Sequence, residues 1–261
     1  MDNSVLTARA SDGSVIRLEC HDALQSTARL AKEYARRSYP DRYVVFSDKR
    51  KKVDADGKES GEVESGIFMS CLLRPSIFPS QAALINSLST VALATALEEH
   101  TTKSIGIGWA SKIYCDGRLI GDVTIEGKLD NFTSYEYIII TFSATLTEEN
   151  FPPRITDIIR KVFDSESISI PLIIAKNILN KFFPLYVNIK NNSEFMDTYR
   201  QKLILRGQRI KYINDDGKKE SCRVVDVNVE NAALEVETKN KEIIRILTPN
   251  RVVIPKRIKI K

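Results

Sequence analysis

Metal-binding side chains are scarce in this sequence, which has four cysteines and two histidines among 261 residues. The cysteines are far apart and none belongs to a CxxC pair, so their spacing argues against a zinc site. Most of them lie in apolar, strand-like runs, where we expect small core residues in a reducing compartment. The six residues are Cys20, His21, Cys71, His100, Cys115 and Cys222.

Long apolar runs are also missing, because no stretch reaches the roughly 18 residues that a membrane-spanning helix needs. Residues 1–4 are polar, and no apolar segment of the signal-peptide type follows them. We therefore expect a cytoplasmic protein with no membrane partner. Internal repeats and low-complexity tracts are absent as well.

A strong excess of one charge is not present either. The net charge is +5 and the pI is about 8.9, a mild basic excess that suits a solvated surface. A nucleic-acid-binding surface needs its Lys and Arg clustered on one face, so we expect no DNA partner. Hydrophobic residues make up 43% of the chain, which is enough to form a core.

The first half of the chain reads as a mixture of strands and helices. Apolar and polar residues alternate over 4–20 around Asp12-Gly13, which predicts a β-hairpin with a tight turn. Helical periodicity follows Ser26-Thr27, with Ser26 as the N-cap, and ends before Pro40. Strands are predicted at 43–46, 66–73, 103–110 and 136–146, the last central in its sheet, with a hairpin at 113–126 and a deeply buried helix at 80–99.

The second half changes character twice. Helices are predicted at 154–163, 170–183 and 193–203. Short strands with turn signals between them follow, at 209–213, 221–228, 233–238, 242–247 and from 252 onward. The expected fold class is therefore α+β, with one domain over 1–205 and a small all-β domain, a barrel or a sandwich, over 206–261.

Residues 47–65 have almost no large apolar side chain, and we expect a polar loop between two buried strands. Such loops are uncommon in compact domains and are usually functional or disordered. The basic run 49–52 (KRKK) would cradle a phosphate in the functional interpretation and form a solvated loop in the ordinary one. The acidic residues either bind Mg²⁺ or neutralise the lysines; they are Asp54, Asp56, Glu59, Glu62 and Glu64.

The order of these elements and several local motifs resemble the biotin protein ligase family over about residues 16–254. Ser26-Thr27 is similar to the Ser-Thr-Asn at the start of that family's first helix. Residues 66–70 (GIFMS) and 72–75 (LLRP) resemble its GxYxS strand and the xLRP that follows. Trp109 matches the Trp of its KWPND motif, and Gly121 and Glu126 match a glycine and an acidic residue after the next hairpin. Residues 150–153 and 199–207 fit the run into the C-terminal domain.

The resemblance implies a fold of the class II aminoacyl-tRNA synthetase and biotin ligase type. Its expected form is a mixed or antiparallel sheet flanked by helices, followed by a small C-terminal β-barrel. It also implies a reaction in which biotin and ATP, with Mg²⁺, form biotinyl-adenylate, and a lysine of a biotin carrier domain then takes the biotin. Such chemistry needs fixed cations and backbone donors aimed at the phosphates.

The family's phosphate-binding motifs are not preserved here. Its GRGRxGR segment falls on 51–57 (KKVDADG), which puts Lys51 and Val53 at two glycine positions and Asp54 at an arginine position. A carboxylate facing a phosphate reverses the sign of the interaction, and Val does not readily adopt the backbone of an anion-binding nest. Asp48 stands in place of the glutamine before that motif.

The second motif has lost its polar residues as well. KWPND reads GWASK over 108–112, and the later GxGINxN strand reads IITFSAT over 139–145. Arg118 is the nearest candidate for the second catalytic lysine, after a gap of one residue. Each well-placed cation or donor is worth about 3 kcal/mol in the transition state, so several losses would remove most of the rate.

Two hypotheses follow from this pattern. In the first, the protein is a pseudoenzyme that has kept the fold and binds a small ligand, a biotin carrier domain or a homodimer mate. In the second, it is an active ligase for biotin, or a similar acid such as lipoate, with Arg118 and Lys112 as catalytic cations. DNA binding is not expected, because the family's DNA-binding members carry an N-terminal helix-turn-helix and the short segment before the first predicted helix has no room for one. The candidate ligand-binding residues are Ser26, Thr27, Asp48, Lys51, Lys52, Asp54, Gly66, Phe68, Trp109 and Gly121.

Overall fold

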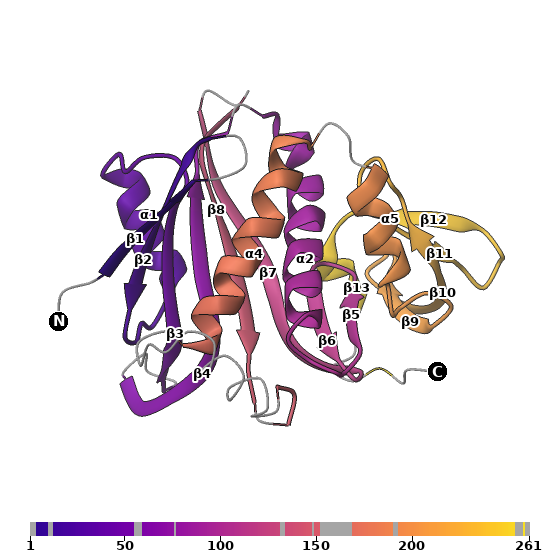
Figure 1. The fold of residues 1–261 in the computed structure, drawn as a ribbon. Helices are drawn as coiled ribbons and strands as arrows, with labels where there is room; N and C mark the ends of the chain where they lie inside the picture. The colour runs from indigo at the N-terminus through magenta and orange to yellow at the C-terminus, as the bar shows by residue number, and fades with distance from the viewer. Residues whose placement is uncertain are drawn as a thin grey trace.

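In the computed structural model, the larger part of the protein is built around an eight-stranded sheet (Figure 1). Described are residues 4–9, 13–54, 59–75, 77–130, 134–147, 149–151, 169–189, 193–253 and 258. In spatial order the strands are β1 (Ser4–Arg9), β2 (Val15–His21), β3 (Tyr43–Val53), β4 (Glu59–Leu73), β8 (Ser134–Thr145), β7 (Arg118–Asp130), β6 (Lys112–Cys115) and β5 (Ile105–Gly108). Only β2 and β3 pair in parallel, so the sheet is mixed, as the α+β prediction expected.

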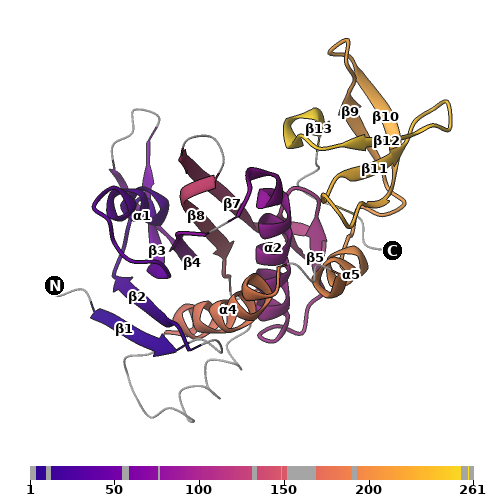
Figure 2. The ribbon, with the colours of Figure 1, turned by 90° about the horizontal axis from the view of Figure 1, so that it is seen from above.

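Helices cover both faces of this sheet. Along β3, Val44 and Phe46 join the core cluster that contains α2 (Ala82–Glu98) and α4 (Ile170–Val187). Tyr43 and Val45 point the other way, into a cluster with α1 (Thr27–Arg36). The alternation of side chains along a strand therefore separates α1 from the other two helices, as Figure 2 shows.

Most predicted elements are present within two to four residues of their expected bounds. Ser26 caps α1, its hydroxyl accepting the Arg29 N–H at 3.2 Å. The 4–20 hairpin is formed by β1 and β2, and β8 lies centrally between β4 and β7. The predicted helix at 154–163 lies outside the described residues.

The helix α4 differs from its prediction in two ways. It continues through Pro184 to Val187, although Pro184 has no N–H for the carbonyl one turn earlier; the Asn188 N–H bonds the Pro184 carbonyl at 3.3 Å and closes the last turn. With 18 residues it is also long and apolar enough to cross a membrane, by length and composition only, whereas the sequence predicted no such segment. Seven of its side chains are buried in this fold, against α2 and the sheet, which is the arrangement of a core helix.

The prediction of a polar loop at 47–65 is wrong for the part of this segment that the structure describes. The strands β3 and β4 continue outward as an antiparallel hairpin, with Arg50 opposite Glu64 and Val53 opposite Glu59. Cross-strand ion pairs join Arg50 to Glu64 and Lys52 to Glu62, and opposite charges on paired strands stabilise a sheet. Residues 55–58, at the tip, lie outside the described residues.

The C-terminal part is a five-stranded antiparallel sheet that begins after α5 (Ser193–Gln201). It joins the larger sheet at β5, where the Ile107 N–H bonds the Lys202 carbonyl at 2.8 Å and the Ile204 N–H bonds the Ile107 carbonyl at 3.0 Å. In spatial order its strands are β12 (Ile243–Ile246), β11 (Leu234–Glu237), β10 (Lys219–Val227), β9 (Arg209–Ile213) and β13 (Val252–Val253).

Candidate functional site

A cavity of about 80 Å³ lies where the start of α1 meets β4 and β8. Its wall combines aromatic rings, hydroxyls and one guanidinium. The fold places these groups together because the N-cap of α1 sits over the middle of the sheet, where β4 and β8 pair. The lining residues are Leu24, Gln25, Ser26, Thr27, Ala28, Arg50, Phe68, Thr141, Phe142 and Ser143.

A chain of three hydroxyls ties α1 to the two central strands. The Thr27 Oγ1 lies 2.8 Å from the Ser70 Oγ, which lies 2.9 Å from the Thr141 Oγ1. Ser70 is fully buried and Thr27 nearly so. Buried hydroxyls are stable only when they are hydrogen-bonded, so this chain fixes the position of the helix start against the sheet.

The guanidinium of Arg50 forms the polar end of the cavity. It lies 4.6 Å from the centroid of the Phe68 ring, within the range of a cation–π contact. Its Nη2 donates to a Glu64 carboxylate oxygen at 2.6 Å, and the Thr145 hydroxyl donates to the other oxygen at 2.5 Å. Burial alone would raise the pKa of Glu64, but the hydrogen bonds from Thr145 and Arg50, with the Arg50 charge, hold that pKa below its ordinary value.

A shallower groove of about 270 Å³ adjoins the cavity and shares Leu24, Gln25 and Ser26 with it. The segment before α1 is held to β3 by two backbone hydrogen bonds between Leu24 and residues 49 and 51, at 3.2 and 2.9 Å. Glu59 lies in the groove, where it accepts hydrogen bonds from Gln25 at 3.1 Å and from Lys51 at 3.2 Å. The groove is therefore charged, and its lysine already has a carboxylate partner.

The remaining predicted cations are paired in the same manner. The Lys52 Nζ lies 2.9 Å from Glu62, and this contact raises the pKa of the lysine and lowers that of the glutamate. The Lys112 Nζ lies 2.7 Å from Asp122. Neither lysine lines the cavity between α1 and β4.

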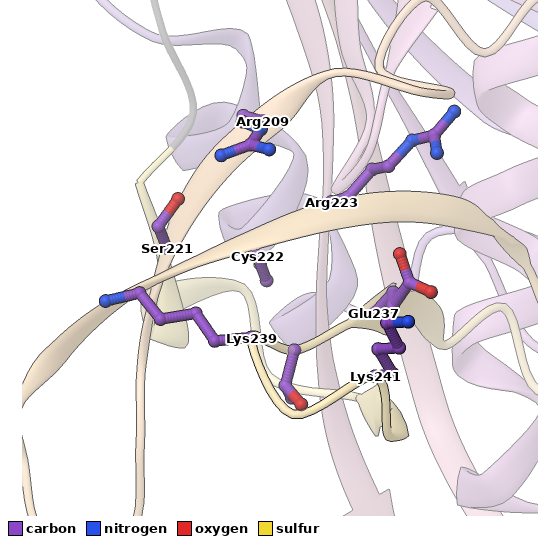
Figure 3. A pocket seen from close by; sticks show the side chains of 8 residues that line it. Arg209, Ser221, Cys222, Arg223, Glu237, Lys239 and Lys241 are labelled. Carbon is purple, nitrogen blue, oxygen red and sulfur yellow. The ribbon is translucent and has the colours of Figure 1, made fainter.

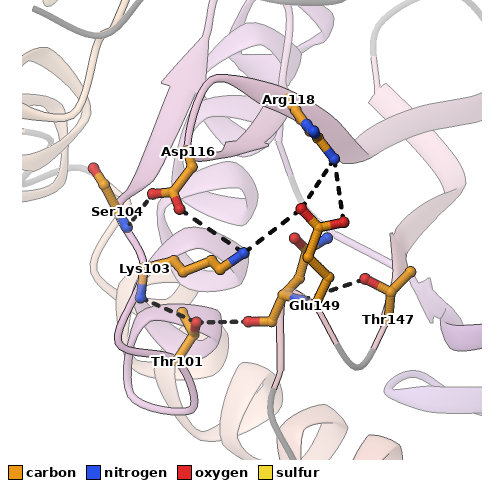
Figure 4. Close-up of polar contacts among 8 residues, drawn as sticks. Thr101, Lys103, Ser104, Asp116, Arg118, Thr147 and Glu149 are labelled. Atoms are coloured by element: carbon orange, nitrogen blue, oxygen red, sulfur yellow. Dashed lines mark hydrogen bonds and ion pairs between the residues drawn. The ribbon is translucent and has the colours of Figure 1, made fainter.

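Arg118 lies in a separate polar cluster at the turn between β6 and β7 (Figure 4). Its Nη1 is 3.0 Å from Glu149, and Lys103 lies 4.0 Å from both Glu149 and Asp116. The cluster holds the β6–β7 turn to the segment after β8, and Arg118 does not line the cavity. The structure therefore does not bring the predicted catalytic pair to the α1 cavity.

The two predicted glycines have a packing role. A Cβ on Gly66 would lie 2.3 Å from the Ala144 carbonyl oxygen, and one on Gly121 would lie 2.1 Å from the Ser143 carbonyl oxygen. Both glycines therefore allow β4 and β7 to approach β8 closely. Neither has a left-handed backbone conformation.

Trp109 lies at the junction with the C-terminal sheet rather than in the cavity. It is buried, and its indole Nε1–H donates to the Ala232 carbonyl at 2.9 Å. Asp48 sits at a shift in the β3–β4 register, and Asp54 follows the end of β3. Neither aspartate lines the cavity or the groove.

The structure thus brings together Ser26, Thr27 and Phe68 from the predicted set, with Lys51 in the adjoining groove. Sequence reasoning missed Arg50 and Thr141 as lining residues. The only signal for Arg50 was the basic run 49–52, and the run does not indicate which of its side chains point toward the cavity. Within the described part of the chain, no group of His, Cys, Asp and Glu is arranged to hold a metal ion.

Comparison with known proteins agrees with this geometry at the level of the fold. No protein-family profile matches the sequence. A stretch of 143 residues is 27% identical to the bifunctional ligase/repressor BirA of Bacillus subtilis (strain 168). The match covers 53% of this chain and 43% of BirA, so this chain spans less than half the length of that relative.

Solved structures resemble nearly the whole chain. The apo biotin protein ligase of Aquifex aeolicus is 17% identical, with a TM-score of 0.64 over 90% of this chain and 97% of its own. The same enzyme with biotin and ATP has a TM-score of 0.62, at equal identity and coverage. A biotin protein ligase-like protein of unknown function from Silicibacter sp. tm1040 is 12% identical, with a TM-score of 0.59 over 92% of this chain and 97% of its own. The chain therefore has the fold of biotin protein ligases.

Proposed function

We propose that this protein is a catalytically degenerate member of the biotin protein ligase fold, which binds a small ligand between α1 and β4 and forms no acyl-adenylate. The observation that carries the proposal is the pairing of its candidate cations. Five of the basic side chains that could replace the missing phosphate-binding residues each contact a carboxylate. They are Arg50, Lys51, Lys52, Lys112 and Arg118.

Paired cations are poor phosphate ligands for a physical reason. Adenylate formation builds negative charge on phosphate oxygens, and catalysis needs positive charge fixed in advance at that place. A cation whose partner is a carboxylate presents little net charge, and taking it from that partner leaves the carboxylate beside the phosphate. The extended β3–β4 hairpin adds to this effect. A glycine-rich loop has free backbone N–H groups that bind phosphate, whereas the backbone of the hairpin is paired between its two strands.

The size of the cavity limits the ligand. Pockets for drug-sized ligands usually measure about 300–1,000 Å³, and this cavity measures about 80 Å³. Ser26, Thr27 and Thr141 contribute hydroxyls to its wall and Phe68 contributes an aromatic ring, which suits a small molecule with one polar group and an apolar body. A biotin carrier domain or a second copy of the chain would then dock on the retained fold as partner.

One alternative has support of its own. The match to BirA and the likeness to a ligase solved with biotin and ATP favour an active ligase for biotin or a similar acid such as lipoate. In that case ligand binding would open the ion pairs, and Lys112 and Arg118 would move to the phosphates. The two functions differ in whether the nucleotide part of an adenylate contributes to binding.

Isothermal titration calorimetry with biotin and with biotinyl-adenylate tests the proposal. We expect the adenylate to bind no more tightly than biotin, because no fixed positive charge meets its phosphate. A T27V variant should weaken whichever of the two binds, while S104A, remote from the cavity, should leave binding unchanged. Adenylate binding a hundredfold tighter than that of biotin would overturn the degenerate function.

A further inference from the structure

The largest of the cavities described, about 340 Å³, lies in the C-terminal sheet and is basic. It lies on the far side of the molecule from α1, at β9, β10 and the turn after β11 (Figures 1 and 2). Four of its eight lining residues are basic and one is acidic. The lining residues are Arg209, Ser221, Cys222, Arg223, Glu237, Thr238, Lys239 and Lys241, shown in Figure 3.

Two arginines of this cavity occupy opposite positions on neighbouring strands. Arg209 on β9 is directly paired with Arg223 on β10 in the strand register. Like charges in directly opposite positions destabilise a sheet. Neither guanidinium forms an ion pair or a side-chain hydrogen bond with any residue that the structure describes, and both are exposed.

Other arginines of the same sheet behave differently. Arg245 pairs with Glu235 at 3.0 Å and Arg251 with Asp215 at 2.8 Å. Arg206, just before β9, pairs with Asp226 at 2.7 Å. Unpaired arginines are therefore concentrated at the cavity, where an external anion would offset their repulsion.

The turn between β11 and β12 adds further groups that suit an anion. Lys241 has a φ of 63°, in the left-handed region that non-glycine residues seldom occupy and that is enriched at binding sites. Its N–H bonds the Thr238 carbonyl at 3.1 Å, which fixes the turn that carries Lys239 and Lys241. The Thr238 Oγ1 is buried and has no hydrogen-bond partner among the described residues, so its hydroxyl is available to an acceptor.

We propose that this cavity binds a small molecule that carries two or more adjacent phosphate groups. An arginine guanidinium can donate two parallel hydrogen bonds to the oxygens of one phosphate. The four basic side chains around the cavity carry more positive charge than a ligand with a single carboxylate would balance. The cavity has the volume of a small-molecule site. Its wall contains no aromatic ring for base stacking, which favours a compact phosphate ligand over a single-stranded nucleic acid.

Titration calorimetry of the whole chain with inorganic tripolyphosphate, at low and moderate salt, tests this site. The double variant R209Q/R223Q removes two charges from the cavity. The control K218Q/K219Q removes two charges from the end of the β9–β10 turn and the first residue of β10, and neither lysine lines the cavity. We expect R209Q/R223Q to weaken binding at least tenfold and the control to change it less than twofold.

Two further readouts separate the site from a general charge effect. Tripolyphosphate should raise the melting temperature of the wild type and of the control, but not that of R209Q/R223Q, whose fold circular dichroism would verify. Equal weakening in both double variants, or no binding to the wild type, would overturn the proposal. It would equally be overturned by a short oligothymidylate that binds more tightly than tripolyphosphate through the same two arginines.

Discussion

The Arg50 guanidinium donates to the Glu64 carboxylate at 2.6 Å, across the part of the β3–β4 hairpin that extends beyond the core. The same guanidinium lies over the Phe68 ring at the end of the α1 cavity. This pair therefore joins two features of the protein. The ion pair holds the hairpin in its extended form. It also neutralises the guanidinium of Arg50, which lines the cavity.

Glu64→Gln should destabilise the protein by about 1 kcal/mol, because it removes a charge-assisted hydrogen bond that solvent partly screens. Thermal or urea unfolding at neutral pH measures the loss. The pKa of Glu64 is lowered in the folded state, so its contribution is present above the ordinary glutamate pKa of 4.5 and is lost as pH falls below it. The stability gap between wild type and variant should therefore close in acid.

The control for this change is Glu62→Gln, which breaks the more exposed Lys52 pair on the same hairpin. At neutral pH its effect on unfolding should be smaller than that of Glu64→Gln. If both variants unfold alike, the Arg50–Glu64 pair has no special role in holding the hairpin.

Gly121→Ala should destabilise the fold by about 1–3 kcal/mol, since the added methyl group would overlap the Ser143 carbonyl oxygen and push β7 away from β8. Denaturant unfolding gives the value. Gly61→Ala is the comparison, because a Cβ at Gly61 has open space around it and costs only the strain of its positive φ. A Gly121→Ala variant as stable as wild type would show that the close approach of the strands is not required.

Trp109→Phe should cost about 1–3 kcal/mol, because the Ala232 carbonyl would lose its donor at the junction between the two sheets. Trp109 is the only tryptophan in the chain, so its fluorescence reports on this junction. We expect blue-shifted emission in the native protein and a red shift as the junction opens in denaturant. Solvent-exposed emission from the native protein would contradict the placement of the indole.

Glu19 should make the protein sensitive to alkali. The hydroxyls of Tyr34 and Tyr43 donate to its buried carboxylate at 2.9 and 2.7 Å. Burial, and then these hydrogen bonds, raise the pKa of both tyrosines above the ordinary 10.0. The stability they contribute is complete below pH 10.0 and is lost as pH rises further, because the unfolded tyrosines ionise first.

Glu19→Gln should lower the pKa of these two tyrosines, and a spectrophotometric titration of phenolate absorbance measures the change. The variant should also lose stability less steeply above pH 10.0 than the wild type. An unchanged tyrosine titration would mean that Glu19 does not control the two hydroxyls.

Local sequence chemistry predicts much of this fold. The Asp12-Gly13 turn, the Ser26 cap and the apolar run of β8 each require only nearby residues, and each gave the correct element. The outer β3–β4 hairpin could not be found in this way. It is held by cross-strand ion pairs, and apolar periodicity does not detect strands whose partners are charges.

The candidate site was predictable only in part, for a related reason. Ser26, Thr27 and Phe68 lie in motifs that the sequence displays, and the fold brings them to one cavity. Contacts between distant segments have no local signal. The hydrogen bond from Trp109 to Ala232 spans 123 positions, and the pairing of Arg118 with Glu149 depends on how a turn lies against the end of β8.

The most direct test of the central claim, a ligase fold without adenylate chemistry, is biotin-dependent exchange of labelled pyrophosphate into ATP. The assay would contain the full chain, Mg²⁺, ATP and biotin, with a competent biotin protein ligase as the positive control. We expect no exchange above the reaction without protein, because five of the candidate cations are held by carboxylates. Exchange that requires biotin and disappears in Lys112→Ala or Arg118→Ala would contradict it.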